Sequence, residues 1–347
     1  MRFKAQAFSI VLLLAYFGCS PVVDPEVQPS CAGTFEGKTF AHHVIGFYPA
    51  YRHDITPVSR IRWDMLTRVI YAFAIPRADG SLDTSRLTQI SALVSTAHAH
   101  GVEVYVSVGG GGSSEGLTAL AANDDTRRIF VETVSQYLET HCLDGVDIDW
   151  EHWTKDNANL PVASEKASLV ALLQDLRTAL DGPKISLDVY PGDWFGRHYE
   201  DVHPLVDYVH VMGYDFSGPW SAPGPHSSFE QAIGSGSSAS STGLAYWTNY
   251  RRWPKNKIVL GVPFYGRDFD DRGGAGITYR DIVARHSDAP GMDRVANIYY
   301  NGVQTITDKT RYAIDNGLPG VMIWEIAQDT EDPATSLLHA IDAVANP

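Results

Sequence analysis

The chain has 347 residues and a formal charge of −14, with 41 acidic side chains against 27 lysines and arginines. So large a negative excess repels phosphate backbones, which argues against nucleic acid as a partner. The length leaves room for one large domain together with terminal segments that lie outside it.

The N-terminus has the pattern of an export signal. Arg2 and Lys4 precede an apolar stretch, residues 8–17, which is too short for an ordinary membrane span. We therefore predict a signal peptide over residues 1–18, a flexible tether over residues 19–40 and one folded domain over residues 41–347.

The three cysteines bear on where the protein acts. Cys19 stands where a bacterial lipoprotein carries its lipid, so we expect an exported protein that meets the membrane only through this anchor. Tyr16 and Phe17 depart from the usual lipoprotein signal, and simple secretion is the alternative. An oxidising location would let Cys31 and Cys142 pair, although the sequence does not show that they meet.

Eight short runs rich in β-branched or aromatic residues predict strands. In chain order they cover residues 44–48, 69–75, 102–108, 145–151, 184–190, 208–212, 257–263 and 320–324. Apolar residues at helical spacing lie between several of them, over residues 87–97, 126–140 and 169–176. Repeated alternation of strand and helix predicts a parallel sheet, and eight repeats predict closure into an α/β fold, the (β/α)8 TIM barrel. Active sites of such barrels lie at the C-terminal ends of the strands.

The fourth of these runs carries an unusual concentration of carboxylates, namely Asp144, Asp147, Asp149 and Glu151. Side chains of a strand alternate between two faces, so the last three share one face and apolar residues take the other. If helices cover the apolar face, the acidic face must point into a polar cavity, because an unpaired buried carboxylate is costly. Crowded carboxylates cannot all ionise, so at least one should have a raised pKa and donate a proton near neutral pH.

The same run has two other possible interpretations. A solvated edge strand could keep the same charges in water, but such a strand would not carry a second, apolar face. A metal site is the other, since carboxylates bind divalent ions. The valine and isoleucine interleaved at strand period do not suit a calcium loop, so we predict no metal.

The run resembles the Asp-x-x-Asp-x-Asp-x-Glu signature of family 18 glycoside hydrolases, the chitinases and their relatives. Four further segments resemble the same family in the same order, at residues 107–110, 212–215, 261–267 and 320–325. The resemblance extends from His43 to Asp329. It implies hydrolysis of β-1,4 linkages between N-acetylglucosamine units, in chitin or chitooligosaccharides, without a cofactor.

The resemblance also implies roles for the acidic residues. In family 18 the 2-acetamido oxygen of the substrate attacks the anomeric carbon, so no enzyme carboxylate acts as nucleophile. Glu151 would protonate the leaving oxygen and then activate water. Asp149 would hold the acetamido N–H, and Asp147 would share a proton or hydrogen bond with Asp149. Tyr214 would bind the acetamido oxygen, and Asp215 would contact the sugar or tune the acidic cluster.

Aromatic residues complete the expected site. Trp324 would form the floor on which the distorted sugar stacks. The other residues that we expect to bind substrate are Phe47, Gly110, Met212, Trp194 and Trp220. Tyr51 is a further candidate for stacking.

Three alternatives for function stay open from the sequence. Residues 112–116 satisfy the Gly-x-Ser-x-Gly pattern of serine hydrolases around Ser114, but four consecutive glycines precede it where a nucleophile elbow needs one sharp turn. Some barrels of this family bind chitin-like sugars without cutting them, usually after loss of the catalytic glutamate, which is present here. Other relatives, the endo-β-N-acetylglucosaminidases, cut the chitobiose core of N-glycans.

The length between the last two strands bears on the shape of the cleft. Residues 268–319 must hold any insertion there, and a helix around residues 307–316 already takes part of them. We therefore expect only a small insertion and a shallow, open cleft, which favours cuts within a polymer.

Overall fold

The computed structural model describes residues 31, 37, 40–155, 162–192, 197–199, 202–234 and 242–347. The predicted signal peptide, Cys19, most of the predicted tether and Trp194 lie outside the described residues.

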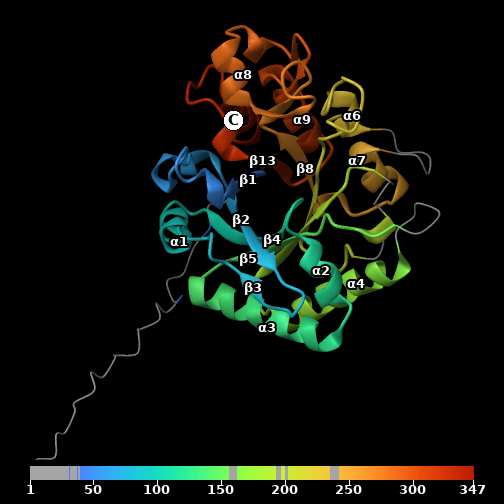
Figure 1. Ribbon diagram of the computed structural model, residues 1–347. Helices are drawn as coiled ribbons and strands as arrows, with labels where there is room; N and C mark the ends of the chain where they lie inside the picture. Colours follow the sequence, from blue (N-terminus) through green and yellow to red (C-terminus); the bar gives the residue numbers. More distant parts are fainter. Residues whose placement is uncertain are drawn as a thin grey trace, which may run out of the picture.

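Eight parallel strands form a closed barrel (Figure 1). Each pairs with the next, and the last pairs with the first, in the order β1 (His43–Pro49), β2 (Arg68–Pro76), β4 (Glu103–Gly109), β5 (Gly145–Asp149), β6 (Lys184–Val189), β7 (Tyr208–Val211), β8 (Ile258–Pro263) and β13 (Gly320–Trp324). The predicted TIM barrel is confirmed, and every predicted strand is found with ends that differ by at most two residues. The two-residue strand β3 (Leu82–Asp83) extends the sheet by pairing antiparallel with β2.

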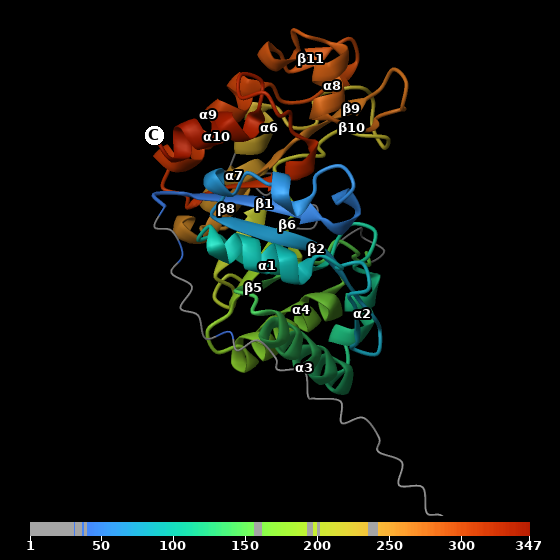
Figure 2. The same ribbon diagram turned by 90° about the vertical axis from the view of Figure 1, so that its left-hand side faces the viewer.

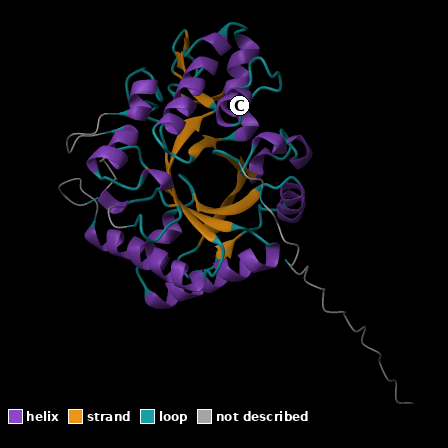
Figure 3. Ribbon diagram, turned by 180° about the vertical axis from the view of Figure 1, so that it is seen from behind, coloured by secondary structure: helices purple, strands orange, loops and turns teal. Residues whose placement is uncertain are grey.

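Helices surround the ring of strands (Figure 3). They are α1 (Ile90–Ala99), α2 (Glu115–Ala121), α3 (Asp124–His141), α4 (Ala163–Ala179), α6 (Phe229–Ile233), α7 (Gly243–Ala245), α8 (Tyr279–Arg285), α9 (Val303–Asp315) and α10 (Leu337–Ala345). Short 3-10 turns lie at Ala50–Arg52, Val58–Arg60, Trp63–Met65, Arg197–Tyr199, Lys255–Lys257, Ala289–Gly291 and Ile326–Gln328, and a π-helical turn at Tyr246–Tyr250. None of the described helices is long and apolar enough to cross a membrane.

The connection between β8 and β13 contains a small insertion. Its strands β9 (Tyr265–Asp268), β10 (Ala275–Thr278), β11 (Arg294–Val295) and β12 (Ile298–Tyr299) form an antiparallel sheet. Figure 2 shows this sheet and α8 at the top of the molecule, with α3 and α4 at the bottom. The prediction of at most a small insertion is therefore confirmed.

Helix α3 delivers the chain to the acidic strand. The Asn123 side chain caps its first turn by accepting hydrogen bonds from two backbone amides, and Cys142 ends it in the left-handed conformation. Cys142 also forms a disulfide with Cys31, so the pairing that the sequence left open is present. This bond ties residue 31 to the end of α3, just before β5 begins.

Strand β5 has the two faces that its sequence predicts. Val146 and Ile148 belong to the apolar core between the barrel and the helices. Asp147 and Asp149 are buried and alternate with them, so they point into the barrel. Because β5 lies between β4 and β6, the alternative of a solvated edge strand is wrong.

A buried ion pair lies at the lower end of the barrel, where the parallel strands begin. Arg68, at the start of β2, is completely buried, and its Nη2 lies 2.6 Å from Oε2 of Glu103 at the start of β4. The guanidinium also lies over the rings of Tyr105 and Tyr208, at 4.1 and 4.6 Å from their centroids. Lys184 is a second partner of Glu103, at 3.1 Å.

We predict that Glu103→Gln lowers the free energy of unfolding by about 2–4 kcal/mol, because it leaves the buried Arg68 charge without its counter-ion. Urea unfolding followed by circular dichroism measures this difference. The control is Glu132→Gln, which breaks the exposed Arg128–Glu132 pair of α3 and should change the free energy by less than about 1 kcal/mol. Equal losses in the two variants would contradict the account.

Candidate active site

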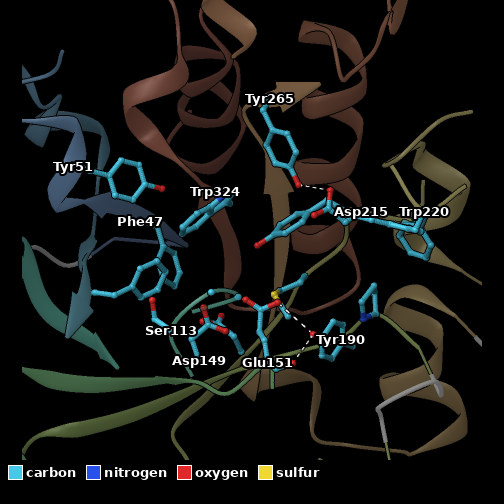
Figure 4. A pocket seen from close by; sticks show the side chains of 18 of the residues that line it. Phe47, Tyr51, Ser113, Asp149, Glu151, Tyr190, Asp215, Trp220, Tyr265 and Trp324 are labelled. Carbon is cyan, nitrogen blue, oxygen red and sulfur yellow. Dashed lines mark hydrogen bonds between the residues drawn. The ribbon is translucent and has the colours of Figure 1, made fainter. Parts of the chain in front are cut away.

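A pocket of about 870 Å³ lies where the barrel strands end (Figure 4). This volume suits the burial of a small ligand. Nine of the residues predicted from the sequence line it: Phe47, Tyr51, Asp149, Glu151, Met212, Tyr214, Asp215, Trp220 and Trp324. Asp147 and Gly110 support the site from behind this lining.

Glu151 follows the end of β5 and is held from two sides. Its backbone amide donates to the Ser114 hydroxyl at 3.0 Å, and the Tyr190 hydroxyl donates to its carbonyl oxygen at 3.2 Å. Burial, together with the negative charge of Asp215, raises the pKa of Glu151 to about 7. At neutral pH Glu151 is therefore protonated in a large fraction of the molecules, as a general acid requires.

Asp149 lies next to Glu151 in the pocket lining and has a strongly raised pKa. Burial first, and then the charges of Glu151, Asp188 and Asp147, raise its pKa well above the ordinary value. Interaction between the two carboxyl groups raises the pKa of Asp149 and lowers that of Glu151, so Asp149 is the one of the two that holds a proton more readily. A protonated Asp149 thus presents its proton to Glu151 at the wall of the pocket.

Asp147 finds its partners on neighbouring strands. It accepts hydrogen bonds from the Ser107 hydroxyl of β4 at 2.8 Å and the Ser186 hydroxyl of β6 at 2.6 Å, and His210 Nδ1 lies 3.4 Å away. Burial alone would raise its pKa, but the bonds from His210 and Ser186 lower it. The sequence predicted a bond with Asp149. Neighbouring strands are closer, at about 4.8 Å, than side chains two residues apart along one strand, at about 6.6 Å, and so the bonds run sideways.

Asp215 supplies a fixed negative charge. It has a left-handed backbone (φ 63°) and accepts hydrogen bonds from the Tyr265 hydroxyl at 2.5 Å and Arg267 Nε at 3.0 Å. Burial would raise its pKa, yet interaction with His226 and Arg267 lowers it to about 2. The sequence placed Tyr265 and Arg267 in a family segment without giving them a role, and the structure shows that they position Asp215.

Aromatic rings form the floor and ends of the pocket. The Trp324 ring packs against Phe47 and Phe73, at centroid distances of 5.5 and 5.7 Å. Figure 4 shows Tyr51 and Trp220 on opposite sides of Trp324. The two residues are 59% and 65% exposed, so a ligand can reach both rings, although an arginine lies over each, Arg52 over Tyr51 and Arg267 over Trp220.

Gly110 acts through backbone geometry. Its φ of 93° is in the left-handed region, and a Cβ atom there would lie 2.9 Å from the Phe73 ring. Its amide donates to the Asp149 carbonyl at 2.8 Å. Gly110 therefore fixes the loop against β5, while its neighbours Gly111 and Gly112 line the pocket.

Ser114, at the centre of the Gly-x-Ser-x-Gly pattern, has a supporting role. It is buried, and its hydroxyl oxygen accepts from the amides of both Glu151 and His152 at 3.0 Å. The hydroxyl that a serine hydrolase would use as nucleophile is thus committed to holding the acid loop, and it does not line the pocket.

Asp188, His210 and Tyr190 are among the site residues that were missed from the sequence, although each had a signal. Asp188 and His210 are ionisable residues within otherwise apolar strand segments, which is the pattern that drew attention to β5. Tyr190 directly follows β6, where side chains reach the site in such barrels. A search of every predicted strand for ionisable residues within it or directly after it would have found these three residues.

Asp147, Asp188 and His210 also form a group of side chains close enough to hold a metal ion, with their ligand atoms within 4.8 Å of one another. Their contacts with one another and with two serines lie at hydrogen-bond distances. We interpret them as a hydrogen-bonded group.

Comparison with known proteins places the chain in a family. Residues 43–329 match the model of glycosyl hydrolases family 18, and the chain belongs to this family of chitinases and related proteins. A chitinase-like effector of Moniliophthora perniciosa is 32% identical over 291 residues, which are 76% of this chain and 65% of the relative. The chain therefore spans just under two thirds of that relative.

Solved structures agree on the fold. A chitinase from Bacteroides thetaiotaomicron has a TM-score of 0.78 and 26% identity, with 88% of this chain and 96% of the other covered. A chitinase-like agglutinin from Robinia pseudoacacia has a TM-score of 0.72 and 21% identity, with 89% and 100% covered, and shares the fold.

We predict that Ser114→Ala lowers the free energy of unfolding by about 1–3 kcal/mol, because two largely buried amides lose their acceptor. Denaturant unfolding measures this change. A fluorophosphonate reagent, which labels activated serines, should leave the wild-type protein unmodified at Ser114, as mass spectrometry of peptides would show. Labelling at Ser114 would restore the serine-hydrolase interpretation.

Proposed function

We propose that the protein hydrolyses β-1,4 linkages between N-acetylglucosamine units by a retaining, substrate-assisted mechanism. The observation that carries the proposal is that Asp149 and Glu151 lie together on the wall of an aromatic pocket. Burial and the charge of Asp215 raise the pKa of Glu151 there to about 7. Membership of glycosyl hydrolases family 18 supports the same reaction class.

The reaction begins with the sugar on Trp324. Glu151 donates its proton to the oxygen of the scissile bond, while the acetamido oxygen of the same sugar attacks the anomeric carbon. Asp149 accepts a hydrogen bond from the acetamido N–H, and Glu151, ionised once it has given up its proton, balances the positive charge of the cyclic intermediate. The ionised Glu151 then takes a proton from water, which opens the ring with net retention at the anomeric carbon.

The tyrosines and Asp215 orient the substrate around this step. Tyr214 is buried against the pocket, within 6.1 Å of the Tyr265 ring centroid, and presents its hydroxyl for the acetamido oxygen. Asp215 stays ionised because Arg267 pairs with it. Its charge keeps the pKa of Glu151 high until the proton is transferred.

Cleavage within a chain fits the placement of the exposed aromatic rings. Tyr51 and Trp220 lie on either side of Trp324, so sugars can stack on both sides of the bond that is cut. We therefore propose endo action on chitin or chitooligosaccharides. The chitobiose core of N-glycans presents the same linkage, and an endo-β-N-acetylglucosaminidase activity is the second candidate on that ground.

Glu151→Gln should lower kcat by at least about 10³-fold while leaving sugar binding nearly intact, because the amide keeps the shape but has no proton to donate. Mass spectrometry of products from chitooligosaccharides and a high-mannose glycopeptide, with wild type and variant side by side, measures this. Oligosaccharide cleavage by the wild type alone supports the proposal, whereas glycopeptide cleavage would move it to the second candidate. Binding without cleavage of either would favour a lectin, and activity in the variant would overturn the role of Glu151.

The same variant should be more stable than the wild type at pH 8. The pKa of Glu151 rises from 4.5 to about 7 on folding, so the folded state holds more protons than the unfolded state between these values. The wild type therefore loses stability as the pH rises through this window, by about 3 kcal/mol in all. Urea unfolding at pH 4 and pH 8 should show the advantage of Glu151→Gln growing with pH, and an advantage that is the same at both values would contradict the raised pKa.

We further propose that the protein is exported and anchored through a lipid on Cys19. The Cys31–Cys142 disulfide supports an oxidising location. Cys19→Ala should move the protein from the membrane fraction to the soluble fraction in cell fractionation, with Cys31→Ala as the control that retains the anchor. If Cys19→Ala distributes as the wild type does, the proposed lipid anchor is contradicted and simple secretion is the remaining explanation.

A further inference from the structure

Asp188 and His210 form a contact inside the barrel that the reaction above does not use. Asp188 Oδ1 on β6 lies 3.1 Å from His210 Nδ1 on β7. The two residues are register partners in the parallel pairing of these strands, so the backbone holds them side by side. Asp188 is 2% exposed and His210 is completely buried.

The contact belongs to a row that crosses three strands. His210 Nδ1 lies 3.4 Å from Asp147 Oδ1 on β5, so one imidazole nitrogen faces two carboxyl groups. Asp188 reaches the floor of the pocket beside Asp149. One oxygen of each of these two residues is buried and makes no hydrogen bond to the described residues. Such incompletely bonded carboxyl groups are costly to ionise.

Charge decides how protons distribute along this row. Burial raises the pKa of Asp188 well above its ordinary value, and the charge of Asp147 raises it further. Asp147 is the member whose pKa is lowered, through its bonds to His210 and Ser186. The imidazole therefore stabilises the ionised form of the deepest carboxyl group, while the two carboxyl groups nearer the pocket keep their protons.

We propose that Asp188 and His210 are positioning residues that hold the negative charge of the row on Asp147, so that Asp149 keeps the proton that it presents to Glu151. Their consequence for turnover rests on the proposed function. The arrangement itself is a property of the free protein and can be measured without a substrate.

Other ionisable groups face this row from the elements around it. His43 of β1 and Arg68 of β2 lie on the lower side, where burial and the charge of Arg68 lower the pKa of His43 to about 4. Asp149, Glu151 and Tyr214 lie on the upper side. Arg68 is already paired with Glu103, so its charge is balanced below the row.

The test uses variants of similar shape but different charge. His210→Asn removes the imidazole, Asp188→Leu removes both the acid and its contact with His210, and Asp188→Asn removes the acid but keeps an oxygen that His210 Nδ1 can bond. His98→Asn is the matched control, because it breaks the His98–Asp144 pair at the opposite end of β5. Urea unfolding checks that each variant is folded, and His210→Gln replaces His210→Asn if the latter is not.

The readout is the titration of Glu151 in the free protein, followed by NMR of 13C-labelled carboxyl groups and assigned with Glu151→Gln. We expect His210→Asn to raise the pKa of Glu151 by about one unit, because the negative charge then moves from Asp147 toward Asp149, which lies beside Glu151. Asp188→Leu should raise it as well, Asp188→Asn should raise it less than Asp188→Leu, and His98→Asn should match the wild type. The alkaline limb of kcat/KM on chitooligosaccharides should move by the same amounts.

Several outcomes would overturn the proposal. If Glu151 titrates in His210→Asn as in the wild type, the imidazole only fills space. If the two Asp188 variants shift the pKa of Glu151 equally, the contact of Asp188 with His210 does not affect that pKa. A stoichiometric metal ion in the purified protein, found by elemental analysis, would mean that these side chains are ligands instead. If the wild type shows no turnover, the proposed hydrolysis fails, while the titration still decides the role of the pair.

Discussion

The energetic cost of removing carboxylates from water governs this structure. Strand β5 brings Asp147 and Asp149 inside a closed sheet, and Glu151 follows at its end. Each is accommodated differently. Asp147 ionises because serines and an imidazole bond to it, Asp149 keeps its proton, and Glu151 lies between these extremes with a pKa of about 7. A general acid arises where burial and a neighbouring charge raise a carboxyl pKa without fixing the proton permanently.

The barrel explains why the acidic residues differ so much over a short stretch of chain. Its register places Ser107, Ser186 and His210 around the deeper carboxylate, and all three come from strands other than β5. Nearer the pocket the strands have ended, and loops supply the partners. There Ser114 fixes the Glu151 backbone, and Arg267 keeps Asp215 ionised. The carboxyl groups thus pass from a hydrogen-bonded environment inside the barrel to an open pocket at the ends of its strands.

Local sequence patterns predict most of this architecture. Alternating apolar and acidic residues in β5 predict its two faces, and strand–helix alternation predicts that Glu151, Tyr214 and Trp324 meet at one end. The sideways partners of Asp147 were not predicted, because the register between distant strands is set by closure of the whole barrel. For the same reason the Asp188–His210 contact is invisible in the sequence until β6 and β7 are aligned. The predictions for Cys19 and Trp194 lie outside the described residues.

The central claim is that the substrate's acetamido group is the nucleophile and that Glu151 is both acid and base. The anomeric form of the first product tests this most directly, measured by proton NMR within the first minutes of chitotetraose hydrolysis, before the sugar equilibrates. The account predicts that the β-anomer appears first, because two displacements retain the configuration. The α-anomer appearing first would show direct attack by water and would contradict the mechanism.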